Sequence, residues 1–172
     1  MLCTQNESFG VREKSRLFMD CFYSLADINS EVRLNGAISL LAYLKSSKQT
    51  DDLQYATKRL VQGLGSFRGA SRQGFSLALT EILRNFDEKS IGTASVVKLL
   101  LSLDASFCHT CKASKSGQHA RDRMFAVIFG SISIQASGRL KNHANAREVS
   151  TLIKILVSNS RRKDWARQSC YE

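Results

Sequence analysis

Hydrophobic positions recur at helical spacing in a series of segments that short polar turns separate. In the first segment, Leu17, Phe18, Cys21, Phe22 and Leu25 follow at three- and four-residue steps, which predicts a helix over about 13–26. The same spacing predicts helices over about 31–45, 51–64, 70–86, 91–103, 120–137 and 146–158, with an eighth beginning around Trp165. No run alternates apolar and polar residues between Asn-Gly or Asp-Gly turns, so the pattern favours an all-α fold.

The second to fourth helices have clear predicted ends and faces. Ser30 is a suitable N-cap for the second helix, and Thr50 or Asp51 for the third. The apolar arc expected in the second helix comprises Leu34, Ala37, Ile38, Leu41 and Leu44, widened by Leu40. Gly63, Gly65 and Gly69 mark the end of the third helix, and the fourth is expected to bury Phe75, Ala78, Leu79, Ile82 and Phe86.

Helix pairs near 31–67 and 70–103 follow one another at about 38–40 residues, a period that suits an α-solenoid of HEAT- or armadillo-like hairpins. An irregular helical bundle is the alternative. We expect a flexible N-terminus over 1–12 and one helical-repeat domain over 13–172, with a long polar loop at about 104–118. The last predicted helix stops within its first turns, so we expect this domain to be partial and the chain to be a fragment.

The composition supports helices and shows that positive charge is concentrated in the C-terminal third of the chain. The 172 residues include no proline, as expected for helices joined by Gly- and Ser-containing turns. The net charge is +10, and it is uneven: residues 1–109 hold 13 Lys/Arg against 11 Asp/Glu, whereas 110–172 hold 12 against 4. A basic C-terminal third suits an acidic partner, either nucleic acid or an acidic protein surface, or else is simply a solvated surface.

Targeting signals are not evident in this sequence. The first residues lack a signal peptide, and the longest apolar run is too short to cross a bilayer, so we expect no membrane association. Five cysteines in a chain without a secretory signal are expected to be reduced thiols, in the cytosol or nucleus.

Enzyme chemistry finds little support in the residue pattern. A polymerase needs carboxylates that hold two metal ions, but Asp51-Asp52 and Asp87-Glu88 have no placed partner. Cys108 and Cys111, with His109 between them, are weak candidates for metal ligands because no second Cys/His pair has recognisable spacing. The glycine-rich stretch 63–69 joins two helices, so it is unlike a phosphate loop. We expect no catalytic residues, no cofactor and no small-molecule substrate.

Basic residues are the better candidates for function. The candidate nucleic-acid-binding residues are Arg68, Arg72, Arg161, Arg162, Lys163 and Arg167. For Arg68 and Arg72, together with Arg59, a structural role in bracing neighbouring helices is favoured over phosphate contact. The cluster at 161–167 suits a solvated face or a nuclear import signal as well as a nucleic-acid contact.

Three stretches of the sequence resemble the Myb-binding protein / DNA polymerase phi family. The first is Arg33 to Leu41, and the most specific is Tyr55 to Leu83, which contains Tyr55-Ala56, Arg59-Leu60, Gly63-Leu64 and Leu79-Thr80-Glu81. The third contains Arg121-Asp122, Phe125, Phe129-Gly130 and Ser137-Gly138. The residues between 105 and 118 match nothing in the family pattern.

This resemblance implies an α-solenoid from the N-terminal part of a longer nucleolar protein. It implies a non-enzymatic scaffold for ribosomal RNA gene transcription, ribosome biogenesis and transcription regulation, with transcription-regulator or ribosome-assembly proteins as partners. The alternative is a module that binds ribosomal DNA or RNA directly. A DNA polymerase remains a distant third, because only the family name suggests it.

Overall fold

The computed structural model describes residues 16–47, 49–108, 116–142, 146–162 and 164–171. These residues form the helices α1 (Arg16–Ser24), α2 (Ser30–Ser47), α3 (Thr50–Gly63), α4 (Gly69–Asn85), α5 (Thr93–Cys108), α6 (Ser116–Ala136), α7 (Arg139–Asn142), α8 (Ala146–Arg162) and α9 (Asp164–Tyr171). No strand occurs in these ranges, so the predicted all-α fold is confirmed. The flexible N-terminus predicted for 1–12 lies outside the described residues.

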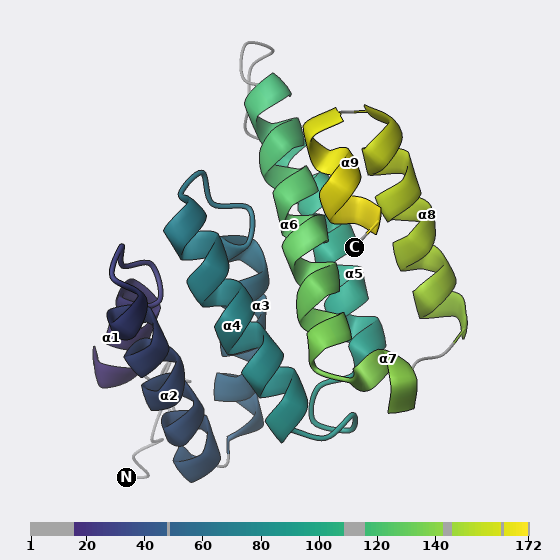
Figure 1. Cartoon of the computed structure of the whole chain (residues 1–172). Coiled ribbons are helices and arrows are strands. Elements are labelled where there is room, and N and C mark those ends of the chain that lie inside the picture. Colours follow the sequence, from purple (N-terminus) through teal and green to yellow (C-terminus); the bar gives the residue numbers. More distant parts are fainter. Residues whose placement is uncertain (1–15, 48, 109–115, 143–145, 163, 172) are drawn as a thin grey trace, which may run out of the picture.

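The helices lie in two rows, and helices that follow one another in the chain run antiparallel (Figure 1). Helices α2, α4 and α6 contact one another in succession and form one row, while α3 and α5 lie side by side behind α4 and α6. Each of α1, α3 and α5 also packs on the helix that follows it, and α8 packs on α9. This order of contacts agrees with consecutive helical hairpins; assignment to the HEAT or armadillo class remains a prediction.

A continuous apolar core runs between the two rows. Its fully buried side chains include Phe18, Leu25, Leu40, Leu60, Leu79, Ile82, Leu100 and Ile134. Near the N-terminal end, the Phe18 ring stacks on Tyr43 at 4.7 Å and meets Phe22 edge-on at 5.3 Å. A smaller cluster joins α6 to α9 through Met124, Ile128 and Ala166. Apolar burial therefore links every hairpin to the next.

Close packing between the hairpins depends on glycine. A Cβ atom on Gly74 of α4 would overlap the carbonyl oxygen of Leu25, at the end of α1. A Cβ atom on Gly130 of α6 would lie 2.5 Å from a methyl group of Leu100 in α5. The overlap at Gly74 is with backbone, so α4 approaches the first hairpin this closely because the side chain is absent. At Gly130 the Leu100 side chain would have to shift to admit a Cβ atom.

The apolar face predicted for α2 is partly wrong. Leu34 is 49% exposed and Ile38 is 57% exposed, whereas the buried positions are Gly36, Ala37, Leu40 and Leu44. Apolar residues surround most of this helix, so their spacing alone does not select the buried face. The face is set instead at Gly36, where a Cβ atom would lie 2.8 Å from the Cβ atom of Ser24 in α1.

Several predicted boundaries also need correction. Helix α5 continues to Cys108 and α6 begins at Ser116, so the predicted loop over 104–118 is helical at both ends. The N-cap of α3 is Gln49, which makes no side-chain hydrogen bond, and not Thr50 or Asp51. The N-cap of α2 is Asn29 and not Ser30, and its Oδ1 accepts the Glu31 N–H at 2.9 Å. The short α7 was not predicted; Gly138, at φ +82°, reverses the chain after α6 and allows it to form.

Candidate nucleic-acid interface

Arg72 lies in the first turn of α4 and holds the α3–α4 turn against α6. Its Nη1 donates to the carbonyl oxygen of Ser66 at 2.7 Å, and its guanidinium carbon lies 3.9 Å from the centre of the Phe125 ring. Burial lowers the pKa of Arg72 from its ordinary value, and the charge of Arg121 lowers it further. These contacts agree with the structural role, bracing neighbouring helices, that the sequence favours for Arg72.

Arg59 has the same kind of role between α3 and α1. Its guanidinium donates to the hydroxyl of Tyr55 at 2.9 Å and lies 4.7 Å from the centre of the Phe22 ring. Arg59 thus contacts both helices, through a hydroxyl and an aromatic ring and not through the carbonyls and carboxylates expected; its structural role stays a prediction.

Arg68, which precedes α4, differs from Arg59 and Arg72. Its side chain is exposed and makes no hydrogen bond to the other described residues, so the predicted bracing contacts are not seen. Its guanidinium lies 5.7 Å from the centre of the Phe67 ring, which is 72% exposed. A cation beside an exposed ring offers a phosphate contact and a stacking surface for a base. Phe67 is absent from the sequence-based candidates, although an aromatic residue in a glycine-rich turn was a usable signal.

The basic cluster at 161–167 lies where α8 ends and α9 begins. Arg161 is exposed, and Arg167 in the first turn of α9 pairs with Asp164 at 2.6 Å. The side chain of Arg162 and all of Lys163 lie outside the described residues. The Arg167–Asp164 pair is exposed and three residues apart, so it is worth only about 0.5 kcal/mol and leaves Arg167 open to a stronger anion.

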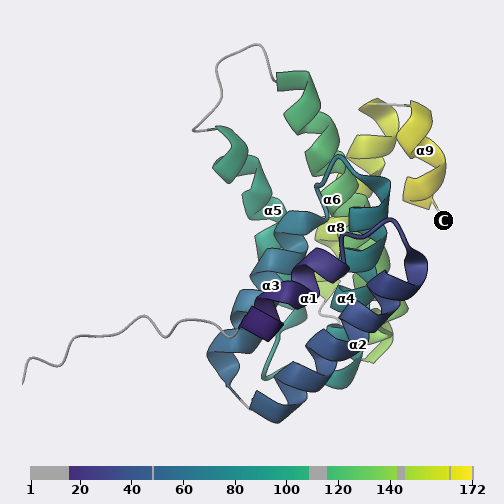
Figure 2. The ribbon, with the colours of Figure 1, turned by 90° about the vertical axis from the view of Figure 1, so that its left-hand side faces the viewer.

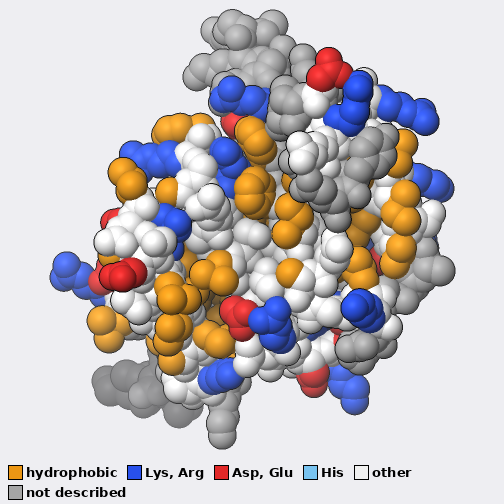
Figure 3. Space-filling view, in the orientation of Figure 1, with side chains coloured by type: hydrophobic (Ala, Val, Ile, Leu, Met, Phe, Trp, Pro, Cys, Tyr) orange, Lys and Arg blue, Asp and Glu red, His pale blue; other side chains and the backbone are white. Residues whose placement is uncertain are grey.

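The structure brings these two groups of arginines to one edge of the molecule. The α3–α4 turn, the first half of α6 and the α8–α9 turn all lie at the upper end in Figures 1 and 2. Figure 3 shows Lys and Arg side chains along this end, and others at the lower end beside Asp and Glu. We call this surface the basic edge and define it by Arg68, Arg121, Arg161 and Arg167, whose side chains are exposed. Arg121 is absent from the sequence-based candidates, although it lies in the charged run Arg121-Asp122-Arg123.

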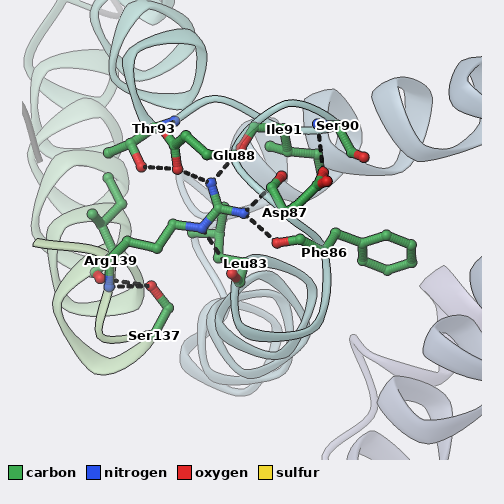
Figure 4. A network of polar contacts seen from close by, with 10 residues as sticks. Leu83, Phe86, Asp87, Glu88, Ser90, Ile91, Thr93, Ser137 and Arg139 are labelled. Atoms are coloured by element: carbon green, nitrogen blue, oxygen red, sulfur yellow. Dashed lines mark hydrogen bonds and ion pairs between the residues drawn. The ribbon is translucent and has the colours of Figure 1, made fainter. Parts of the chain in front are cut away.

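A different arginine, Arg139, organises the opposite end of the molecule (Figure 4). It is 4% exposed, and its guanidinium donates to the carbonyl oxygens of Leu83 at 2.7 Å and Phe86 at 2.6 Å, as well as to that of Ile91. It also pairs with the Glu88 carboxylate at 2.5 Å. Its position after α6 therefore ties α7 to the α4–α5 connection, where the last carbonyls of α4 would otherwise lack partners.

Glu88 links the Arg139 network to the start of α5. Its carboxylate accepts the backbone N–H of Thr93 at 2.5 Å and the Thr93 hydroxyl at 3.0 Å, which caps the helix. Beside it, bonds from Ser90 hold the pKa of the Asp87 carboxyl below its ordinary value. Asp87 and Glu88 are thus carboxylates that cap and connect helix ends. The structural pairing of Glu88 with Arg139 could not be predicted from the spacing of residues in the sequence.

The described cysteines Cys21 and Cys170 are free thiols. Burial raises the pKa of the Cys21 thiol, and also that of Cys170. Cys108 lies at the end of α5, but its side chain and the whole of Cys111 are outside the described residues. Asp52 is buried and accepts the Tyr43 hydroxyl at 3.2 Å. Within the described ranges, no three His, Cys, Asp or Glu side chains lie close enough together to share a metal ion.

In the part of the chain that the structure describes, no helix combines the length and apolarity needed to cross a bilayer.

Comparison with known proteins identifies relatives of this chain. It is 33% identical to Myb-binding protein 1A of Mus musculus over 88% of its length, and 31% identical to a Myb-binding protein 1A-like protein of Danio rerio over 92%. It is 30% identical to the rDNA transcriptional regulator pol5 of Schizosaccharomyces pombe over 89%. The chain spans only 11%, 12% and 15%, respectively, of these three relatives.

No solved structure gives a significant match to the chain. Residues 55–172, which include the arginines of the basic edge, match the family described as DNA polymerase phi. The chain therefore belongs to the DNA polymerase phi family.

Proposed function

We propose that this chain is a non-enzymatic helical scaffold that acts in ribosomal RNA gene transcription. The observation that carries this proposal is its similarity to proteins named as a Myb-binding protein and as rDNA transcriptional regulators. Those names describe binding and regulation, and they apply to proteins several times longer than this chain. We further propose nuclear and nucleolar residence and a contribution to ribosome biogenesis.

The arrangement of helices is suited to binding proteins over a broad surface. Stacked helices present exposed side chains from successive hairpins on a rigid frame, and exposed apolar residues such as Leu34, Ile38 and Ile153 add contact area. Partners of this scaffold would be transcription-regulator or ribosome-assembly proteins.

A cellular experiment tests the scaffold. In cells depleted of the full-length protein, re-expression of the protein with or without the segment equivalent to this chain is followed by pulse-labelling of precursor ribosomal RNA. We expect synthesis to be restored only when the segment is present, with the intact protein in the nucleolus. Equal restoration by the truncated protein would remove the support for this role. Primer extension with Mg²⁺ tests the polymerase alternative, and nucleotide incorporation by the chain would contradict a non-enzymatic scaffold.

Direct binding of ribosomal DNA or RNA is the second candidate. It is favoured by the basic edge, where Arg68 stands beside exposed Phe67 and Arg161 lies at the same end of the molecule. Such binding would depend on phosphate charge and fall steeply with salt. Neither role excludes the other, since a scaffold can present nucleic acid along one edge and proteins on its faces.

A further inference from the structure

A groove runs between α3 and α5, away from the basic edge, and has a volume of about 610 Å³. Figure 2 shows the two helices next to each other, and the connection from α4 to α5 passes beside α3. We call it the lysine groove, because Lys58 of α3, Lys89 of the connection and Lys98 of α5 line it. A volume of this size accommodates a few residues of a bound segment.

Positive charge in the lysine groove is only partly balanced by carboxylates, through Asp87 beside Lys89. No Asp or Glu is among the described residues that line it. Lys58 and Lys98 are exposed and take part in no ion pair with another described residue. Asp87 and Glu88 precede Lys89 in the chain: Asp87 accepts the Ser90 N–H at 2.8 Å and is attracted by the charge of Lys89, whereas Glu88 pairs with Arg139. The groove therefore attracts negative charge.

The floor of the lysine groove is apolar. Its accessible apolar surface comes from the half-buried Leu99, while Ile91, 5% exposed, and Val96, 0% exposed, pack beneath it. A bound segment would thus place apolar side chains on the floor while its charged groups meet the amines at the rim. None of the described lining residues is aromatic, so bases of a nucleic acid would find no stacking partner here.

We propose that the lysine groove binds an acidic peptide segment in which Asp or Glu residues alternate with aliphatic residues. Charge complementarity selects the acidic residues, and the apolar floor selects the aliphatic ones over a phosphate backbone. This inference rests on the proposed scaffold role, for which it names the chemistry of one partner.

Fluorescence anisotropy with the 172-residue chain tests the proposal. The probe is a fluorescein-labelled peptide of about 12 residues in which Glu alternates with Leu; comparison peptides replace Glu by Gln, or Leu by Ser. The variant is Lys58→Glu with Lys98→Glu. Its control is Lys141→Glu with Lys154→Glu, which carries the same change in net charge at exposed positions outside the groove. Circular dichroism confirms that all variants keep their helical content.

We expect the Glu/Leu peptide to bind the parent chain and to lose at least roughly tenfold in affinity in the groove variant, but less than about twofold in the control. Both comparison peptides should bind weakly. Equal loss in the two variants would show attraction by net charge alone and would overturn the proposal. Tighter binding of a 12-nucleotide RNA that the groove variant abolishes would also overturn it, by making the groove a nucleic-acid site. Failure here leaves the ribosomal RNA synthesis test unaffected, so the scaffold role and the groove are judged separately.

Discussion

Arg33 and Arg72 occupy equivalent places in successive hairpins, 39 positions apart in the chain. Each lies in the first turn of the second helix of its hairpin, and each donates through Nη1 to a carbonyl oxygen six residues earlier. The acceptors are Asp27, at 3.0 Å from Arg33, and Ser66, at 2.7 Å from Arg72. The recurrence agrees with the period of about 38–40 residues expected from the sequence. In each hairpin, the arginine guanidinium thus fixes the turn that precedes its helix: Arg33 the turn before α2, and Arg72 the turn before α4.

Replacing Arg72 by alanine tests this bracing. The substitution removes the bond to Ser66 and the stacking on Phe125, and we expect it to lower the free energy of unfolding by about 2 kcal/mol. Urea denaturation followed by circular dichroism measures the change. Arg68→Ala is the matched control, with an expected loss below about 0.5 kcal/mol because Arg68 is exposed. A similar loss for both variants would contradict the bracing role.

Arg139→Met should be more damaging. It leaves the carbonyl oxygens of Leu83, Phe86 and Ile91 without their donor and Glu88 without its charge partner. We expect a loss of about 3–5 kcal/mol in the free energy of unfolding, since removing one partner of a buried network strands the others. Chemical denaturation measures it, with Lys141→Met on the exposed side of α7 as control. A loss below about 1 kcal/mol would show that water replaces the guanidinium.

Gly74→Ala and Gly69→Ala form a matched pair within α4. Alanine normally stabilises a helix by about 0.5–1 kcal/mol relative to glycine. At Gly69 the new Cβ atom meets only Arg72 Nη2 at 3.7 Å, so we expect neutral or slightly increased thermal stability. At Gly74 it overlaps the Leu25 carbonyl oxygen, so α4 must move away from the first hairpin, at a cost of about 2 kcal/mol or more. Differential scanning calorimetry compares the two, and equal melting temperatures would contradict the close approach.

Charge reversal tests the basic edge. Arg68→Glu with Arg161→Glu should weaken binding of a ribosomal RNA fragment across all sequences tested. The slope of log Kd against log salt, measured from about 50 to 200 mM, should fall by about 2 as two phosphate contacts are lost. Electrophoretic mobility shift at several salt concentrations provides the measurement. Lys141→Glu with Lys154→Glu is the control of equal charge, and the same change in slope there would show that binding is not localised to this edge.

Asp87 predicts a pH dependence. Its pKa is lowered from the ordinary 3.8, chiefly by its bonds from Ser90, so the folded state favours the ionised carboxyl. The resulting stabilisation is present above pH 3.8 and is lost as the pH falls through the lower pKa of the folded state. The Asp87→Ala variant should therefore have a lower melting temperature than the parent chain at pH 5. This difference in melting temperature should narrow at about pH 2–3. A gap that widens on acidification would contradict this assignment.

The sequence predicted the helices well wherever apolar residues fall on one side. Leu79 and Ile82 in α4 are buried as expected, because polar residues occupy the opposite face. In α2 the same reasoning wrongly predicted that Leu34 and Ile38 are buried. Leucines and alanines occupy several faces of this helix, so packing at Gly36 decides which face is buried. Long periodic helices are thus readable from one chain, while their buried face depends on contacts between hairpins.

The functional surface was less predictable. Arg72 was expected to have a structural role before phosphate contact; its bond to the Ser66 carbonyl and its stacking on Phe125 agree with that role, which stays a prediction. Arg139 was missed, since a lone arginine in a short polar segment is normally exposed and its partners lie far away in the chain. The lysine groove was missed for the same reason: Lys58, Lys89 and Lys98 come from three separate segments and meet only in the fold.

The Arg139 network has a consequence for how the molecule opens. One guanidinium holds the end of α4, the connection to α5 and the start of α7 at once, so none of them can detach while the others stay in place. Local fluctuations that expose one of these segments must break the whole network. Their backbone amides should therefore exchange with solvent deuterium as a single cooperative unit, where independent hairpins would exchange one by one.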